Sequence, residues 1–129
     1  MKKEIIICSV ILLAIIIFHA ITQTTSQNYF DNISDELDGI EEKLLSNQVE
    51  KVDLENDIDS ILNKWRANYG YYACFIEHDE LEKVQTQLIS IRANIKTGDY
   101  KKSVDESEKC RFILKHIEDK DSLKIVNIF

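Results

Sequence analysis

The stretch that decides the fold is the apolar run IIICSVILLAIIIFHAI, residues 5–21. These residues carry no formal charge, and no acidic or basic residue follows them until Asp31. As an α-helix the run spans about 25 Å, which is at the short end of what crosses a hydrocarbon core of about 30 Å. We therefore predict a transmembrane helix over residues 5–22, preceded by a short segment at residues 1–4.

The charges that flank the run predict its orientation. Lys2 and Lys3 precede it, whereas no basic residue lies between Thr22 and Phe30. The positive-inside rule then places the amino terminus in the cytoplasm and the rest of the chain outside the cell membrane. A cleaved signal peptide is the alternative, but cleavage needs small residues. The run ends in Phe18-His19-Ala20, where Phe does not fit, so we expect an uncleaved single-pass anchor.

The rest of the chain favours helices. Proline is absent and glycine occurs three times, whereas an average chain of this length holds about six prolines and about nine glycines. This scarcity argues against a turn-rich β-sandwich and against a Gly-rich nucleotide-binding loop. Apolar residues recur at steps of three and four in four stripes. The stripes are Phe30, Ile33, Leu37, Ile40 and Leu44; Leu54, Ile58, Ile61, Trp65, Tyr69 and Tyr72; Leu81, Val84, Leu88, Ile91 and Ile95; and Tyr100, Val104, Ser107, Cys110, Leu114 and Ile117.

These patterns predict an all-α protein, in which an N-terminal transmembrane helix is followed by an antiparallel, coiled-coil-like bundle of three to four helices. The helices are expected near residues 29–46, 49–76, 79–97 and 99–117. A polar juxtamembrane segment at residues 23–28 is free to bend, and residues 29–129 form the extracytoplasmic bundle. An apolar tail is expected to fold back onto the bundle; it contains Leu123, Ile125, Val126, Ile128 and Phe129.

Local signals mark the helix boundaries. Ser46 and Asn47 separate the first two bundle helices. Asp79 is placed to cap the third helix, with Glu82 in the capping-box position. Gly98 suits the left-handed conformation that ends this helix, and Asp99 is placed to cap the next one.

Seven residues are candidates for an interaction surface: Trp65, Tyr69, Tyr71, Tyr72, Phe75, His78 and Glu80. If the anchor continues as one rod to Ser46 and the next helix returns antiparallel, residue 73 lies level with residue 22. The aromatic side chains of residues 69–75 then return to the membrane surface, which such rings favour. Two alternatives stay open, because these rings could fill the core or line a ligand pocket.

The sequence predicts no catalytic residue, no cofactor and no metal site. Cys74, His78 and Glu82 could share a helix face, but zinc sites usually need three or four well-spaced ligands. A disulfide between Cys74 and Cys110 is not expected, because counting along antiparallel helices leaves their Cα atoms too far apart.

The charge is uneven along the chain. The formal net charge is −7, which argues against a nucleic-acid partner. Residues 31–59 hold eleven acidic residues and two lysines, whereas residues 60–129 are nearly balanced. This acidic stretch is either a solvated helix face or a surface that meets a basic partner or cations.

The chain also resembles a known family. Five features of the sequence carry this resemblance. They are the Lys2-Lys3-Glu4 start, Trp65, the His78-x-Glu80 turn, the stripe at Leu88, Ile91 and Ile95, and the closing Asn127-Ile128-Phe129. The chain resembles a family of small single-pass membrane proteins from Gram-positive, often spore-forming bacteria. This family is catalogued as a domain of unknown function, number 4363. The resemblance implies the same topology and a bacterial setting. It transfers no activity, cofactor or site residue.

We therefore expect an uncharacterised bacterial membrane protein with a structural, assembly or protein-interaction role, and not an enzyme. Its expected partners are the lipid bilayer and a membrane protein, and self-association is possible. The alternative is a tethered, sensor-like bundle that binds a ligand.

Overall fold

The computed structural model describes the backbone of residues 1–128 and the side chains of residues 1–120. This part forms four helices and no strand: α1 (Lys2–Ser46), α2 (Lys51–Tyr72), α3 (His78–Lys96) and α4 (Tyr100–Ile128). The predicted all-α class is confirmed, and the bundle has four helices.

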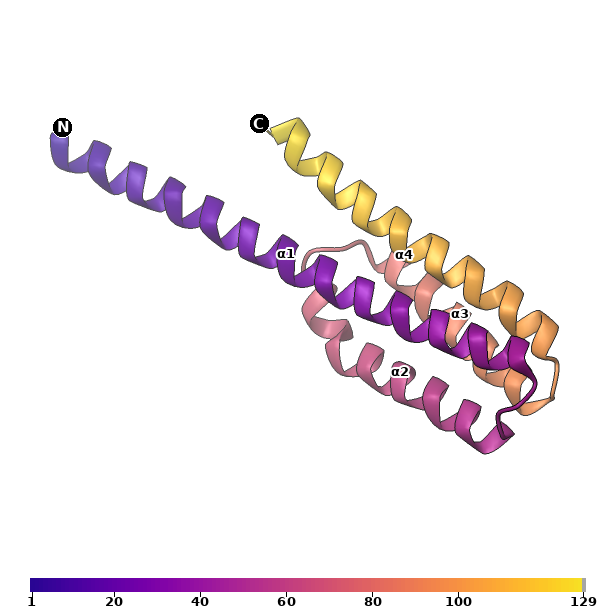
Figure 1. Ribbon diagram of the computed structural model, residues 1–129. Helices are drawn as coiled ribbons and strands as arrows, with labels where there is room; N and C mark the ends of the chain where they lie inside the picture. The colour runs from indigo at the N-terminus through magenta and orange to yellow at the C-terminus, as the bar shows by residue number, and fades with distance from the viewer. Residues whose placement is uncertain (129) are drawn as a thin grey trace.

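The helices run up and down in a ring (Figure 1). α1 packs against α2 and α4, and α3 packs against the same two helices, so α1 and α3 lie diagonally across the core. The α1–α2 and α3–α4 turns lie at one end of the bundle. At the opposite end lies the α2–α3 connection, and beyond this end project the N-terminal part of α1 and, less far, the C-terminal part of α4 (Figure 1).

The projecting part of α1 carries the apolar run. Its side chains from Ile5 to Phe18 are largely exposed, and Ile21 is exposed as well. By length and composition this helix is able to cross a membrane.

The polar residues that follow the run do not interrupt the helix. Residues 22–28, which the sequence suggested could bend, are helical. The hydroxyls of Thr22, Thr24 and Thr25 donate to the carbonyls four residues earlier, at 2.8, 3.0 and 2.9 Å. These bonds satisfy the hydroxyls inside the helix. Thr22 and Ser26 are also buried, so the bundle-facing side of α1 begins about two turns before Phe30.

The core consists of the four predicted stripes. Nearly all of their members are buried, while Tyr69, Tyr100 and Val104 are partly buried against the core. Leu62 and Ile76 are buried too, although the stripes did not include them. On α4 the core positions near the α3–α4 turn are small: Ser103, Ser107 and Cys110 are all fully buried.

The α3–α4 turn follows the local signals. Gly98 has φ 78°, its N–H donates to the Ile95 carbonyl, and the Asp99 N–H donates to the Asn94 carbonyl. This is a Schellman motif with glycine in the left-handed position. The Asp99 carboxylate then accepts a bond from the Lys102 N–H at 3.2 Å, which confirms the predicted cap of α4.

Three predicted boundaries are wrong. α3 begins at His78 after Glu77, so Asp79 lies inside the first turn, where it interacts with the helix dipole instead of capping it. α2 ends at Tyr72 and not near residue 76, because the chain turns there and buries Ile76 in the core. α4 continues to Ile128 and not to residue 117, so the backbone of the apolar tail is helical. Whether the tail's side chains pack on the bundle lies outside the described residues.

We predict that Gly98→Ala lowers the free energy of unfolding by about 1 kcal/mol, because an L residue is strained at positive φ. No atom lies within 4 Å of a Cβ placed there, so the loss reports backbone strain and not a clash. Thermal unfolding of the full chain in detergent micelles, followed by circular dichroism, measures the effect.

Gly39→Ala is the matched control. Gly39 lies inside α1 with equally open space around it, so alanine is expected to stabilise the protein by about 0.5 to 1 kcal/mol. Equal effects of the two substitutions would contradict the assignment of the Gly98 turn.

Candidate functional site

Aromatic side chains gather at the end of the bundle from which α1 projects. Tyr29 stacks on Tyr72 with ring centroids 4.7 Å apart and on Trp65 at 6.2 Å. Phe30 lies 5.3 Å from Tyr72 and 6.1 Å from Trp65. α1 and α2 are thus joined by four rings. Because Trp65 and Tyr72 are 1% and 4% exposed, these two candidate residues belong to the core.

Tyr29 belongs to this cluster, and the sequence reasoning did not select it. Its hydroxyl donates to the Lys64 carbonyl at 3.1 Å. Burial, followed by the neighbouring Tyr72, raises the pKa of Tyr29 above its usual value of 10.0, so the phenol stays protonated and able to donate. Its only signal in the sequence is its place beside Phe30, off the apolar stripe.

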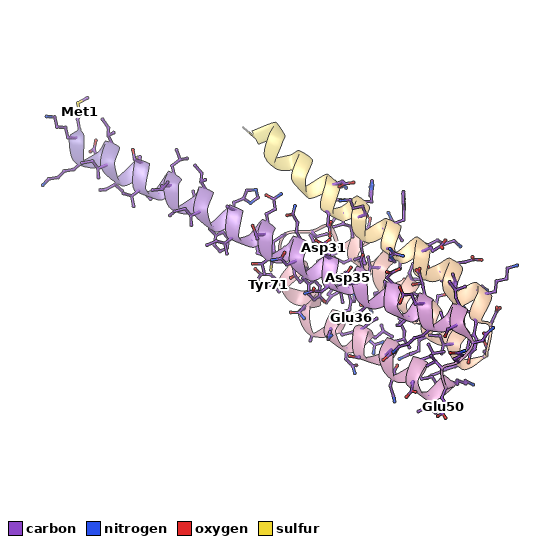
Figure 2. All side chains as sticks on the ribbon, in the orientation of Figure 1. Met1, Asp31, Asp35, Glu36, Glu50 and Tyr71 are labelled. Atoms are coloured by element: carbon purple, nitrogen blue, oxygen red, sulfur yellow. The ribbon has the colours of Figure 1, made fainter. Side chains whose placement is uncertain are left out.

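Tyr71 and Phe75 differ from the other rings because they face outward. Their side chains are 48% and 38% exposed. The two rings meet edge to face at 5.2 Å, and Tyr71 also meets the buried Tyr72 edge to face at 5.0 Å. This exposed pair is therefore fixed to the core, at the end of the bundle where α1 leaves it (Figure 2).

The remaining candidates, His78 and Glu80, hold the α2–α3 connection in place through packing and ion pairs. His78 stacks on Tyr69 with centroids 6.5 Å apart. Glu80 is buried, lies 3.4 Å from Lys83 and lies 4.0 Å from Lys120 of α4. Lys120 also pairs with Glu77 at 3.3 Å. These contacts tie the connection to α4, so His78 and Glu80 have a visible packing role.

A polar seam joins α1 to α4. Arg111 contacts Asp38 at 3.2 Å and the buried Glu41 at 3.0 Å. The local sequence pattern did not predict these two contacts of Arg111, since Arg111 and its acidic partners lie on helices that are far apart in the chain.

A second buried acid lies farther along the same seam. Glu118 of α4 is 8% exposed and shares a hydrogen bond with Asp31 of α1. Burial, together with this bond and the charge of Asp31, raises the pKa of Glu118 from 4.5 to about 7. Among the side chains that the structure describes, Lys115 pairs with it at 3.8 Å and is largely exposed. The two carboxyl groups therefore share a proton near neutral pH.

The acidic stretch 31–59 contributes several of its carboxylates to contacts between helices. Asp57 pairs with Lys43 across the α1–α2 seam, and Asp59 pairs with Arg92 of α3 at 3.7 Å. Glu36 pairs with Lys64 across α1 and α2. Asp31, Asp35 and Glu50 lie on the exterior (Figure 2). Part of the excess negative charge thus has a structural role.

Within the described residues, no group of three or more His, Cys, Asp or Glu side chains is arranged to hold a metal ion. Cys74 is exposed on the α2–α3 connection and its thiol donates to the Gly70 carbonyl at 3.5 Å. Cys110 is buried inside the bundle, and burial raises the pKa of its thiol to about 12. All three cysteines are free.

The described surface has shallow hollows away from the aromatic cluster. Hollows of about 290, 420 and 270 Å³ lie between α1 and α2, between α3 and α4, and between the end of α1 and the start of α4. None of these three is lined by the aromatic candidates Tyr69, Tyr71, Tyr72 or Phe75.

The fold defines a class of helical-bundle proteins in which one helix is long and apolar enough to span a membrane. Residues 20–128 match the model of the family described as "Domain of unknown function (DUF4363)". The chain therefore belongs to the DUF4363 family, as the resemblance implied. The matched region covers the bundle and leaves out most of the apolar run. No curated protein and no solved structure matches the chain.

We predict that Glu118 makes the bundle less stable as the pH rises through neutrality. Its folded-state pKa is about 7 and its ordinary value is 4.5, so the folded state binds this proton more tightly than the unfolded state. The stability from the shared proton is fully present below pH 4.5 and is lost as the pH rises through about 7. Glu118→Gln, which cannot ionise, is expected to flatten this part of the dependence.

The free energy of unfolding is measured in detergent at several pH values between about 5 and about 8, for the wild type and for the variant. Comparing the two proteins removes the contributions of the histidines, which are common to both. Asp35→Asn, an exposed change one turn along α1, is the matched control and should leave the wild-type slope in place. Parallel curves for wild type and Glu118→Gln would contradict the shared proton.

Proposed function

We propose that this protein is a single-pass membrane protein whose helical bundle has a structural, assembly or protein-interaction role outside the cell membrane. The observation that carries the proposal is the projecting part of α1, which holds an uncharged run with its apolar side chains exposed. Burying one large aliphatic side chain is worth about 1.5 to 3 kcal/mol. A projecting helix with this many exposed isoleucines and leucines therefore needs lipid or protein around it.

The orientation follows from charge. Lys2 and Lys3 lie at the tip of the projecting helix, and the next lysine or arginine along the chain is Lys43, in the last turn of α1 at the far end of the bundle. The positive-inside rule favours a cytoplasmic tip and an extracytoplasmic bundle.

A role in binding or assembly is favoured by how the polar side chains are used. The buried acids Glu41, Glu80 and Glu118 each contact a group on a neighbouring helix. Trp65 and Tyr72 fill the core, so Tyr71 and Phe75 are the members of the aromatic cluster available for contact. This distribution favours a role that uses the outer surface of the bundle rather than an enclosed ligand site. We propose no enzymatic activity.

The anchor is tested by placing charges within it. An arginine at the centre of a membrane helix costs about 2.5 to 3.5 kcal/mol on the insertion scale. Wild-type protein is expected in the membrane pellet, and Leu12→Arg with Ile16→Arg is expected to shift it to the soluble fraction. Leu45→Arg is the matched control, because Leu45 is exposed at the opposite end of α1 and its replacement leaves the anchor intact.

The side of the membrane is tested with protease added to intact protoplasts. Digestion of the bundle supports the orientation. A wild-type protein that stays soluble, or a bundle that is protected in intact protoplasts, would contradict the proposal.

The partner is tested by photo-crosslinking in native membranes. Phe112 is a large apolar side chain that is 74% exposed on α4, so a photoreactive residue there samples the outer face of that helix. We expect a discrete crosslinked product containing a membrane protein or a second copy of this chain. The same probe at Lys101, exposed near the α3–α4 turn, is the control for random collision. Equal, diffuse labelling from both positions would count against a dedicated protein partner on this face.

A further inference from the structure

We propose that the exposed aromatic pair, Tyr71 and Phe75, rests on the lipid surface and gives the bundle a second point of attachment to the membrane beside α1. This inference rests on the proposed function, since it requires α1 to be the anchor. The partner it assigns to the pair is the headgroup layer of the bilayer on the side of the bundle.

The position of the pair along the bundle supports the contact. Tyr72 stacks on Tyr29, so these two residues lie at the same level of antiparallel helices. The chain makes one more helical-type turn after α2, in which the Phe75 N–H donates to the Tyr72 carbonyl at 3.0 Å, so Phe75 lies level with about residue 26 of α1. The apolar run ends at Ile21, so Phe75 is about 8 Å beyond the end of the run at 1.5 Å per residue.

This distance matches the thickness of the headgroup layer. A bilayer with a hydrocarbon core of about 30 Å is about 40 to 45 Å thick in total, which leaves about 5 to 8 Å of headgroups on each side. Phe75 reaches this layer with α1 upright. Transmembrane helices tilt by about 20° on average, and a tilt toward α2 brings Tyr71 to the same depth.

The structure of the pair suits an interface. A tyrosine favours the boundary between hydrocarbon and water because its hydroxyl can stay in the wet layer, and the apolar ring of Phe75 can bury beside it on the hydrocarbon side. The pair is held rigidly, because Tyr71 packs on the buried Tyr72 and Phe75 packs on Tyr71. It therefore enters the interface with little loss of side-chain freedom.

The pair lies at the same end of the bundle as the part of α1 assigned to lipid, which is why we assign lipid and not a protein to it. Both lie at the same end of the bundle, and Tyr71 lies beside the point where α1 leaves it (Figure 2). Two attachments restrict tilting of the bundle relative to the membrane, so the α1–α2 and α3–α4 turns point away from the membrane.

Native cysteines allow a direct test on the full chain in phosphatidylcholine and phosphatidylglycerol vesicles. A nitroxide on Cys74 (in Cys8→Ala) reports the pair, and a nitroxide on Cys8 (in Cys74→Ser) reports the anchor. Both thiols are exposed, whereas Cys110 is buried with a raised pKa and stays unlabelled. A nitroxide at Gln48→Cys, in Cys8→Ala with Cys74→Ser, is the distal control, about 33 Å away across the 22 residues of α2.

Accessibility to oxygen, which concentrates in lipid, is compared with accessibility to a polar nickel complex. We expect the Cys8 label in hydrocarbon, the Gln48 label in water, and the Cys74 label at headgroup depth with several-fold lower nickel accessibility than the Gln48 label. Tyr71→Ser with Phe75→Ser should return the Cys74 label to the accessibility of the distal control. Phe112→Ser, which removes an exposed ring elsewhere, should not.

The remaining outcomes separate the two proposals. A Cys8 label in lipid with a fully water-accessible Cys74 label overturns the second attachment and leaves the anchor standing. A Cys74 label shielded from both reagents means that protein covers the pair, which also overturns lipid contact. A Cys8 label in water overturns the proposed function itself.

Discussion

The structure depends on the helical continuity of α1 through residues 22–28. Seven polar residues in a row would ordinarily favour a flexible link. Here the threonine hydroxyls bond to the carbonyls of the preceding turn, and Thr22 and Ser26 are buried by the bundle. The apolar run and the first bundle helix therefore form one rod of 45 residues. Because the rod is continuous, the bundle has a defined distance and direction from the run, and the level of every other helix follows from its packing on α1.

Two kinds of contact hold the other helices to this rod. The apolar stripes supply the core, and at one end they are joined by the stacked rings of Tyr29, Phe30, Trp65 and Tyr72. Buried acidic side chains supply the second kind of contact, and their carboxyl groups have different partners. Glu41 has an arginine and Glu80 has two lysines, whereas Glu118 faces another carboxyl group. The ion pair of Glu118 with the largely exposed Lys115, at 3.8 Å, offsets only part of the cost of burying this carboxylate, so a proton shared with Asp31 adds to it at that point of the α1–α4 seam.

Much of the fold was predictable because helical periodicity is local. The residues at steps of three and four within each stripe did become the core, and Gly98 and Asp99 formed the turn that their conformational preferences favour. The errors lie where a tertiary contact overrode a local preference. α2 ends early because burial of Ile76 turns the chain. The extension of α4 was missed because Asp119, Lys120 and Asp121 interrupt the apolar stripe, although charged residues do not end a helix.

The candidate site was predicted only in part, because its residues come from helices that are distant in the sequence. The sequence placed the aromatic residues 69–75 at one end of the bundle, and the apolar stripe already included Trp65 and Tyr72, which are buried, and left out Tyr71 and Phe75, which are exposed. It also gave no sign of Tyr29, Arg111 or the Asp31–Glu118 pair.

The sequence by itself determined the helical class, the uncharged run and the identity of the core positions, since each depends on the composition and spacing of neighbouring residues. Only the tertiary structure decided which rings stack on one another across helices, which acids meet a cation and which acids meet each other. Those outcomes depend on the face and the level at which separate helices meet, and the periodicity within any one helix carries no information about its partner.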